Sequence, residues 1–330
     1  MSKQPLCSTE IGALWMTYQK KTVILRMIEY FRETAESTRA RKLLDNMWKD
    51  LYPMVEELKH ILQKEGAAVP IGFTEHDVNL NAPPLYINGF GVMFSRVLKE
   101  ISMGMYTLHV TMTYRDDIIK YYRRLTQITH TYYYEFTTYL LEEGLLPRPT
   151  FINLPQSSAY ITDKAYLKGT NILGHKRKLN TIEFGYLYHL IETNITGMQL
   201  ISGFAQCADD SDLKRYFLKG QQLSKKMIAE ATALLQAEDI QVPATPGGTV
   251  TNSTVSPFSE KLMTYCVYLL SNFGLGGQSF GAAFSLRNDL NATMSFLAKD
   301  VFEFARDGIH IMIANGWLEE PPSMDIHHLR

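Results

Sequence analysis

Cysteine is scarce in this sequence. Its 330 residues include only three, Cys7, Cys207 and Cys266, which are widely separated and form no CxxC pair. Secreted domains held together by disulfides and zinc sites built from cysteine both need closely spaced or paired cysteines. The cysteine content therefore argues against both classes.

Long apolar runs are also missing. No stretch of about 18 uninterrupted apolar residues occurs, so no membrane-spanning helix and no membrane insertion are expected. The first ten residues, MSKQPLCSTE, contain no apolar run of the kind found in secretory signals. The sequence therefore predicts a cytoplasmic protein that is not secreted.

A net charge is almost absent, because 33 Lys and Arg residues oppose 34 Asp and Glu residues. The whole chain therefore has no electrostatic attraction to nucleic acid or to an anionic membrane, and no nucleic-acid partner is expected. Apolar residues make up 45% of the chain, which is enough for large folded cores. The length suggests about two domains.

The sequence repeats itself once. Thr9–Trp15 resembles Thr181–Tyr188, and this alignment places equivalent residues 173 positions apart, with a one-residue slip to 172 later in the chain. Four pairs of charged residues keep this register: Glu10 and Glu183, Glu65 and Glu238, Arg115 and Arg287, Asp117 and Asp289. A register held across both halves predicts two copies of one structural unit.

Each copy contains four segments with helical periodicity and suitable helix ends. The predicted helices are Thr9–Glu36, Thr38–Glu65, Pro84–Thr113, Asp116–Glu143, Thr181–Cys207, Asp210–Ala237, Pro257–Leu286 and Asp289–Asn315. Alternating β-branched runs bounded by turns are missing, so the predicted fold is all-α.

The lengths of the connections distinguish between types of helical bundle. In each copy the first and third connections are a few residues long, whereas the second is long. Short, long and short connections are typical of a ferritin-like four-helix bundle with one long crossover between its second and third helices. We therefore predict two tandem ferritin-like bundles, at residues 1–147 and 180–330, with a linker at residues 148–179.

Three motifs resemble a known family. They are PIGFTEHDVNLNAPPL at Pro70–Leu85, PFSEKLM at Pro257–Met263 and NGWLEEPP at Asn315–Pro322. They are similar to the tandem ferritin-like family catalogued as domain of unknown function 3231, which occurs in spore-forming bacteria. Some of its members are described as "putative spore coat proteins". The resemblance covers Glu10 to Pro322 and implies a non-secreted protein related to sporulation, but no defined chemistry.

Ferritin-like bundles often hold two iron or manganese ions, with a Glu on each of two helices and an ExxH motif on each of the other two. The weak candidates for metal ligands here are Glu57 with His60, and Asp307 with His310. On a helical wheel, however, all four lie beside the apolar stripe or toward the polar side. We therefore expect a solvated polar face, no catalytic residues and no cofactor, with iron or manganese as the alternative.

Three further features have both a functional and a structural interpretation. The tyrosines Tyr132–Tyr134 and Tyr121–Tyr122 could support radical chemistry, but packing in the bundle explains them better. The basic run His175–Lys178 could bind an acidic partner, although so short a run is usually a solvated turn. The glycines Gly274, Gly276, Gly277 and Gly281 predict a close approach between helices or a local kink.

Three functional hypotheses follow. The first is a non-enzymatic structural or interaction protein that assembles with itself or with protein partners, as a spore coat or other spore-layer component. The second is a ferritin-like di-metal oxidase or metal store, based on the fold alone. The third is a bundle that binds an apolar small molecule among its 15 methionines and 19 tyrosines.

Overall fold

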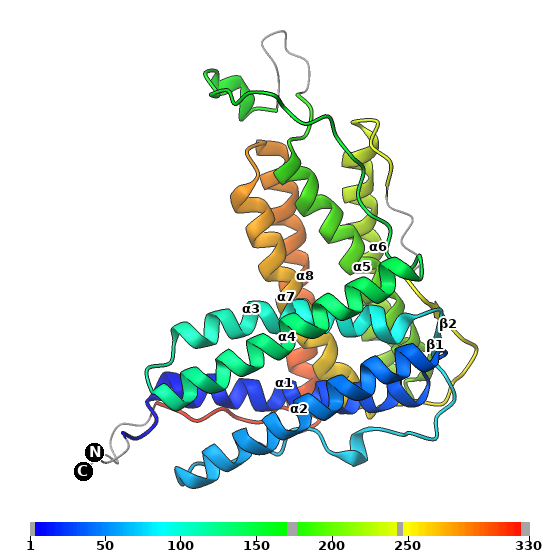
Figure 1. The fold of residues 1–330 in the computed structure, drawn as a ribbon. Helices are drawn as coiled ribbons and strands as arrows, with labels where there is room; N and C mark the ends of the chain where they lie inside the picture. Colours follow the sequence, from blue (N-terminus) through cyan, green and yellow to red (C-terminus); the bar gives the residue numbers. More distant parts are fainter. Residues whose placement is uncertain (1–3, 170–176, 243–246, 325–330) are drawn as a thin grey trace. The chain divides into compact units, whose positions relative to one another are not determined.

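The structure is a computed structural model that describes residues 4–169, 177–242 and 247–324. Within these residues the fold is all-α, as predicted, with eight long helices (Figure 1). The helices are α1 (Ser8–Glu33), α2 (Thr38–Lys64), α3 (Phe90–Thr111), α4 (Asp116–Glu142), α5 (Thr181–Cys207), α6 (Ser211–Gln236), α7 (Glu260–Phe284) and α8 (Asn288–Ala314). The short, long, short order of connections is the predicted one.

The third helix of each copy begins later than predicted. Tyr86–Ile87 forms the short strand β1, and Gly89 precedes α3 in a left-handed conformation with a φ of 74°, so α3 begins at Phe90 rather than Pro84. In the second copy Phe258 forms an isolated bridge with Val78, so α7 begins at Glu260 rather than Pro257. Backbone pairing in the crossovers therefore replaces the first predicted turn of both helices.

The two crossovers pair with each other. Strand β1 is antiparallel to β2 (Thr249–Val250), with Tyr86 opposite Val250. Further along, the Ser259 N–H donates to the Asp77 carbonyl at 3.0 Å. The 173-residue offset of the repeat makes Asp77 the counterpart of Val250, and Tyr86 that of Ser259. The two pairings are therefore equivalent under exchange of the copies, and they join the crossovers by a local pseudo-twofold arrangement.

The chain forms two compact units. The first contains residues 1–143, 248–266 and 311–330, and the second contains residues 144–247 and 267–310. The division proposed from the repeat follows sequence similarity, whereas these units follow contacts in space. Two pieces of the second sequence copy thus belong to the first unit. One is most of its crossover together with the start of α7, and the other is the end of α8 together with the segment that follows it.

The first unit contains the helices α1, α2, α3 and α4. Helix α1 packs against α2 and α3, and α4 packs against α2 and α3, so the four lie side by side as neighbours in a bundle (Figure 1). Apolar residues at helical spacing on α2, including Leu44, Leu51 and Leu58, are fully buried. Along Thr17–Leu25 every residue of α1 is buried, so this helix has no solvated face there.

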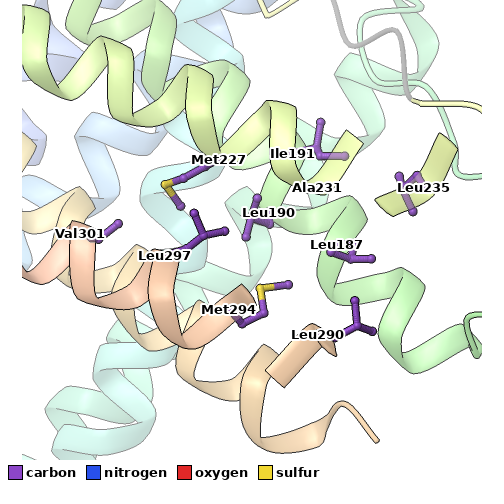
Figure 2. Packing of buried hydrophobic residues seen from close by; sticks show 10 residues of the cluster. All are labelled: Leu187, Leu190, Ile191, Met227, Ala231, Leu235, Leu290, Met294, Leu297 and Val301. Carbon is purple, nitrogen blue, oxygen red and sulfur yellow. The ribbon is translucent and has the colours of Figure 1, made fainter. Parts of the chain in front are cut away.

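The second unit has an apolar core built from three helices. Its buried residues come from α5 (Leu187, Leu190, Ile191), α6 (Met227, Ala231, Leu235) and α8 (Leu290, Met294, Leu297, Val301), and they face one another in Figure 2. Residues of α7, among them Leu275 and Ala282, pack against the edge of this cluster. Burial of such side chains is worth about 1.5–3 kcal/mol each and supplies most of the stability of a bundle.

The charged residues that keep the repeat register cap one end of each bundle. In the first copy the Glu10 carboxylate accepts hydrogen bonds from the backbone N–H groups of Tyr114 and Arg115 at 2.9 and 2.7 Å, directly before α4. Arg115 in turn pairs with Glu65 at 2.8 Å and with Asp117 at 2.8 Å. Burial raises the pKa of Glu10, but the backbone N–H of Cys7, followed by those of Tyr114 and Arg115, outweighs this effect and holds the pKa below its usual value.

The second copy repeats this cap with its own residues. Glu183 accepts hydrogen bonds from the N–H groups of Leu286 and Arg287, and the Arg287 guanidinium pairs with Glu238 and Asp289, both at 2.7 Å. These are the residues equivalent to Glu10, Arg115, Glu65 and Asp117. The repeated charged residues therefore satisfy helix ends and tie distant helices together, which is a structural role.

Close contacts at glycine occur, but not where they were predicted. A Cβ atom added at Gly274, Gly276 or Gly277 would meet nothing within 4 Å, so the predicted close approach is wrong at these positions. At Gly220 of α6, in contrast, it would lie 2.4 Å from Ile201 Cδ1 and 2.5 Å from Phe304 Cζ. The tight helix packing of the second unit therefore depends on Gly220, in a helix whose sequence contains no glycine cluster.

Substituting Gly220 by alanine is expected to destabilise the protein by about 1–3 kcal/mol, because the added methyl group overpacks a buried contact between α5, α6 and α8. Chemical denaturation of the full chain measures the change. Gly185→Ala is the matched control, since a Cβ there meets nothing within 4 Å on an exposed position of α5. It should be neutral or stabilising by up to about 1 kcal/mol. Equal effects of the two substitutions would contradict the packing described here.

Candidate functional site

The first pair of candidate metal ligands lies on the surface of α2. The half-buried Glu57 carboxylate forms an ion pair with Arg124 of α4, and His60 is exposed. The two side chains are therefore placed beside solvent, on the polar flank that the helical wheel indicated.

The second pair is placed in the same way on α8. Asp307 is partly exposed and accepts a hydrogen bond from the Lys219 amine of α6 at 2.6 Å, while His310 is exposed. Among the residues that the structure describes, no group of three or more His, Cys, Asp or Glu side chains is arranged to hold a metal ion. The carboxylates of Glu57 and Asp307 are engaged by cationic side chains instead.

The tyrosine cluster of α4 is mainly a packing feature, as expected. Tyr121, Tyr122 and Tyr132 are buried, whereas Tyr134 is exposed. The Tyr121 hydroxyl donates to the Met54 carbonyl at 2.9 Å, and the Tyr132 hydroxyl donates to Asp50 at 2.7 Å. These rings fill the bundle and use their hydroxyl groups to satisfy polar partners.

The interpretation of the basic run as a solvated turn is wrong for Arg177. This side chain is buried and forms a two-pronged ion pair with Glu183 at 2.7 and 2.9 Å. It also lies over the Tyr166 ring, 3.9 Å from the centroid. His175 and Lys176 lie outside the described residues. Arg177 thus reinforces the cap formed by Glu183, a role that a run of basic residues in the sequence does not indicate.

The three motifs that carry the family resemblance meet in the first unit. The Glu319 carboxylate accepts hydrogen bonds from the N–H groups of Ile71 and Gly72, both at 2.7 Å. The Lys261 amine donates to the Gly72 carbonyl at 2.9 Å, and the Ser259 hydroxyl donates to Asp77 at 2.6 Å. These motifs therefore hold the first crossover in place.

The interior of the first bundle contains a polar stripe. On α3 it consists of residues spaced three or four apart, all at most 3% exposed: Ser95, Lys99, Ser102, Tyr106 and His109. Such spacing places side chains on one face of a helix. Opposite this stripe, α1 contributes Thr17, Lys20 and Lys21, which are also fully buried.

Two of the buried amines, those of Lys20 and Lys21, lie over one ring. Lys20 Nζ and Lys21 Nζ lie 4.7 and 5.0 Å from the centroid of the Tyr106 ring. Lys20 also donates to the thioether of Met105 at 3.3 Å. Within the described part of the chain, Lys21 Nζ and Lys99 Nζ have no hydrogen-bond partner. Because a lysine amine is almost always solvated or paired, this cluster is the most unusual polar site in the bundle.

The pKa values of these groups reflect their surroundings. Burial lowers the pKa of Lys99 to about 7. Burial, and then the charge of Lys99, lowers the pKa of Lys20 and Lys21 well below the usual lysine value, and Lys20 adds to the effect on Lys21. Burial and Lys20 lower the pKa of His109 to about 4. Desolvation and mutual repulsion of like charges thus favour the neutral amines.

A hydroxyl relay borders the amines. The Thr17 hydroxyl lies 3.1 Å from His109 Nδ1 and 3.0 Å from the Tyr122 hydroxyl. Burial raises the pKa of Tyr122 and of Tyr106. The site therefore offers hydroxyl and amine donors, and among the described residues no carboxylate raises the pKa of Lys20, Lys21 or Lys99. When the amines are protonated, such a set suits an anion better than a metal cation.

A second feature is an exposed apolar segment between α4 and α5. It includes Phe151, Leu154 and Tyr160, which are 86%, 76% and 96% exposed, together with Ile152 and Ile161. Elsewhere in the second unit, Phe280 and Phe284 of α7 stack on each other, Phe284 stacks on Tyr186, and both phenylalanines are more than half exposed. Exposed apolar groups of this size are typical of protein-binding surfaces.

None of the described helices is both long and apolar enough to cross a membrane. The family model described as protein of unknown function (DUF3231) matches residues 1–157 and again residues 167–328. No curated protein matches the chain. A solved structure titled "putative spore coat protein", from Bacillus halodurans C-125, is 13% identical; the match covers 46% of this chain and 98% of that chain, with a TM-score of 0.41.

Proposed function

Since this chain belongs to the family described as protein of unknown function (DUF3231), with one match in each copy of its repeat, we propose that it is a non-enzymatic structural or interaction protein associated with sporulation. It acts as a component of the spore coat or of another spore layer, built on two ferritin-like bundles. It is made and retained in the cytoplasm of the sporulating cell, and it works by binding protein partners or further copies of itself.

The exposed apolar segment carries this proposal. Phe151, Leu154 and Tyr160 would each bury a large apolar area on binding, at about 25 cal/mol per Å² removed from water. The segment around them, residues 147–161, contains no helix or strand. The resemblance to a family with spore coat members supplies the cellular setting.

Fractionation of spores from the source organism tests the setting. An antibody against the protein should detect it in the coat extract and not in the core fraction. Detection only in vegetative cells would contradict the proposal. The metal content of untagged protein, measured by mass spectrometry, tests the di-metal alternative, because about two iron or manganese ions per chain would overturn the structural role.

The double substitution Phe151→Ser, Leu154→Ser tests the segment. It should weaken self-association or retention in the spore layer by about 10-fold or more, because it removes two exposed apolar anchors at no cost to either core. Light scattering coupled to size-exclusion chromatography, and recovery from the coat extract, measure the change. Ile71→Ser is the matched control, because Ile71 is 72% exposed but lies outside the segment. Equal behaviour of both variants would contradict the assignment.

A further inference from the structure

The amine cluster in the first bundle has a cost that packing alone does not explain. Lys21 and Lys99 are fully buried, and within the described residues neither amine has a hydrogen-bond partner. An unpaired buried lysine is either charged without compensation or neutral at the expense of its proton, and both states destabilise the fold. A group that accepts hydrogen bonds from these amines would recover that cost.

The chemistry of the cluster specifies what such a group must be. A charged lysine amine donates hydrogen bonds and accepts none, and the ring of Tyr106 offers its face to Lys20 and Lys21 rather than a strong acceptor. Three amines that share a site carry up to three positive charges. A doubly charged, acceptor-rich anion therefore complements them better than a single carboxylate or any cation.

We propose that Lys20 and Lys21 of α1 and Lys99 of α3, which are all buried in the interior of the first bundle, form a binding site for a small tetrahedral oxyanion of the phosphate class. Lys20 reaches toward the half-buried Met105, beside the exposed Gly104, so one amine lies near the bundle surface. Ser95, whose buried hydroxyl has no partner among the described residues, lies one turn from Lys99 and supplies a further donor.

The second bundle provides an internal comparison. Under the 173-residue offset, Lys20, Lys21 and Lys99 correspond to Thr193, Asn194 and Asn272. The second copy thus carries no amine at these three positions. We therefore expect one site per chain rather than two.

Titration of inorganic phosphate into the full chain by isothermal calorimetry tests the site, at pH 7 and constant ionic strength in a phosphate-free buffer. One saturable site per chain is expected. Binding returns the amines to their charged form, so protons are taken up and the measured heat depends on the ionisation enthalpy of the buffer. At about 100 times the dissociation constant, the midpoint of thermal unfolding should rise by about 5 °C.

The variants Lys21→Met and Lys99→Met should each weaken phosphate binding by about 10-fold or more, because each removes a charge-assisted hydrogen bond. Both variants are expected to fold, since methionine fits a buried position without needing a partner. Lys120→Met is the matched control, because the Lys120 side chain is 63% exposed on α4. Glycerol phosphate, titrated in parallel, distinguishes a site for the free anion from one that also accepts a phosphate ester.

Two outcomes would overturn the site. The first is the absence of saturable heat and of any thermal shift with 10 mM phosphate in the unsubstituted chain. The second is an equal affinity in the Lys21→Met, Lys99→Met and Lys120→Met variants, which would place the bound anion elsewhere on the protein.

Discussion

Replacing Lys99 by methionine is expected to raise the free energy of unfolding by about 4 kcal/mol at pH 7 in a phosphate-free buffer. Burial lowers the pKa of Lys99 to about 7, roughly three units below that of an exposed lysine. Each unit corresponds to about 1.4 kcal/mol of preference for the neutral amine. Methionine has a similar length and carries no charge, so it removes this cost and keeps the packing. Chemical denaturation of both proteins measures the difference.

The same substitution is expected to change how stability depends on pH. Between about pH 7 and about pH 10.4, the unfolded chain binds a proton at Lys99 that the folded chain does not, so stability rises with pH across this window. Lys20 and Lys21 contribute in the same direction. His109 is neutral throughout, and Tyr106 and Tyr122 keep their protons. Lys99→Met should therefore reduce the slope without abolishing it.

A surface lysine separates this effect from a general loss of positive charge. Lys120→Met removes an exposed amine from the same bundle, and it should change stability by less than about 0.5 kcal/mol with an unchanged pH slope. A Lys99→Met protein that is less stable than the original chain would mean that the amine is paired and charged in the folded state. An unchanged slope would mean the same.

Helix positions could be predicted because they depend on local signals. The ends of α2, α4 and α5 lie within a residue of their expected places, since caps such as Ser37 and Asn180 and apolar residues at helical spacing act over a few positions. The predicted start of α3 was wrong because the true start depends on β1, whose partner β2 lies more than 160 residues away in the sequence. Local patterns carry no information about such pairing.

The amine cluster could not be predicted for a related reason. Lys20 and Lys21 are neighbours, and neighbours on a helix point about 100° apart, so a pair of lysines is normally assigned to a solvated face. Helix α1 is buried on every side at this point, which places both amines in the interior. The sequence signal for this site is the spacing of three or four residues between Lys99, Ser102, Tyr106 and His109 on α3, which places polar residues at positions typical of a core.

The charged repeat residues show the opposite case, in which the sequence marked the right residues without their role. Glu183, Glu238, Arg287 and Asp289 stood out because they keep the register with the first copy. Only the structure shows that they form one network, since the Arg287 guanidinium contacts both carboxylates at 2.7 Å and also donates to the Arg177 carbonyl at 3.1 Å. Their spacing in sequence reflects which helix ends meet.

Substituting Arg287 by methionine is expected to lower the free energy of unfolding by about 3–5 kcal/mol, because it leaves the buried Glu238 carboxylate without the guanidinium that compensates it. Arg287 is 1% exposed, and Glu238 is nearly as buried. Asp289, which is more exposed, loses less. Chemical denaturation, or the decrease in the midpoint of thermal unfolding, measures the effect. The double substitution Arg287→Met, Glu238→Leu should recover part of the lost stability by removing the unpaired charge.

An exposed ion pair provides the matched comparison within the same unit. Arg215 and Asp212 of α6 pair at 2.5 Å, with side chains that are 75% and 72% exposed, and Arg215→Met should therefore cost less than about 1 kcal/mol. If both arginine substitutions lowered the free energy of unfolding equally, the buried Arg287 network would stabilise the protein no more than an exposed ion pair does. If the double substitution were no more stable than Arg287→Met alone, the stranded Glu238 charge would not be the cause. A large loss of stability in Arg287→Met that the second substitution partly recovers would instead show that the charged residues retained in both copies stabilise the second unit.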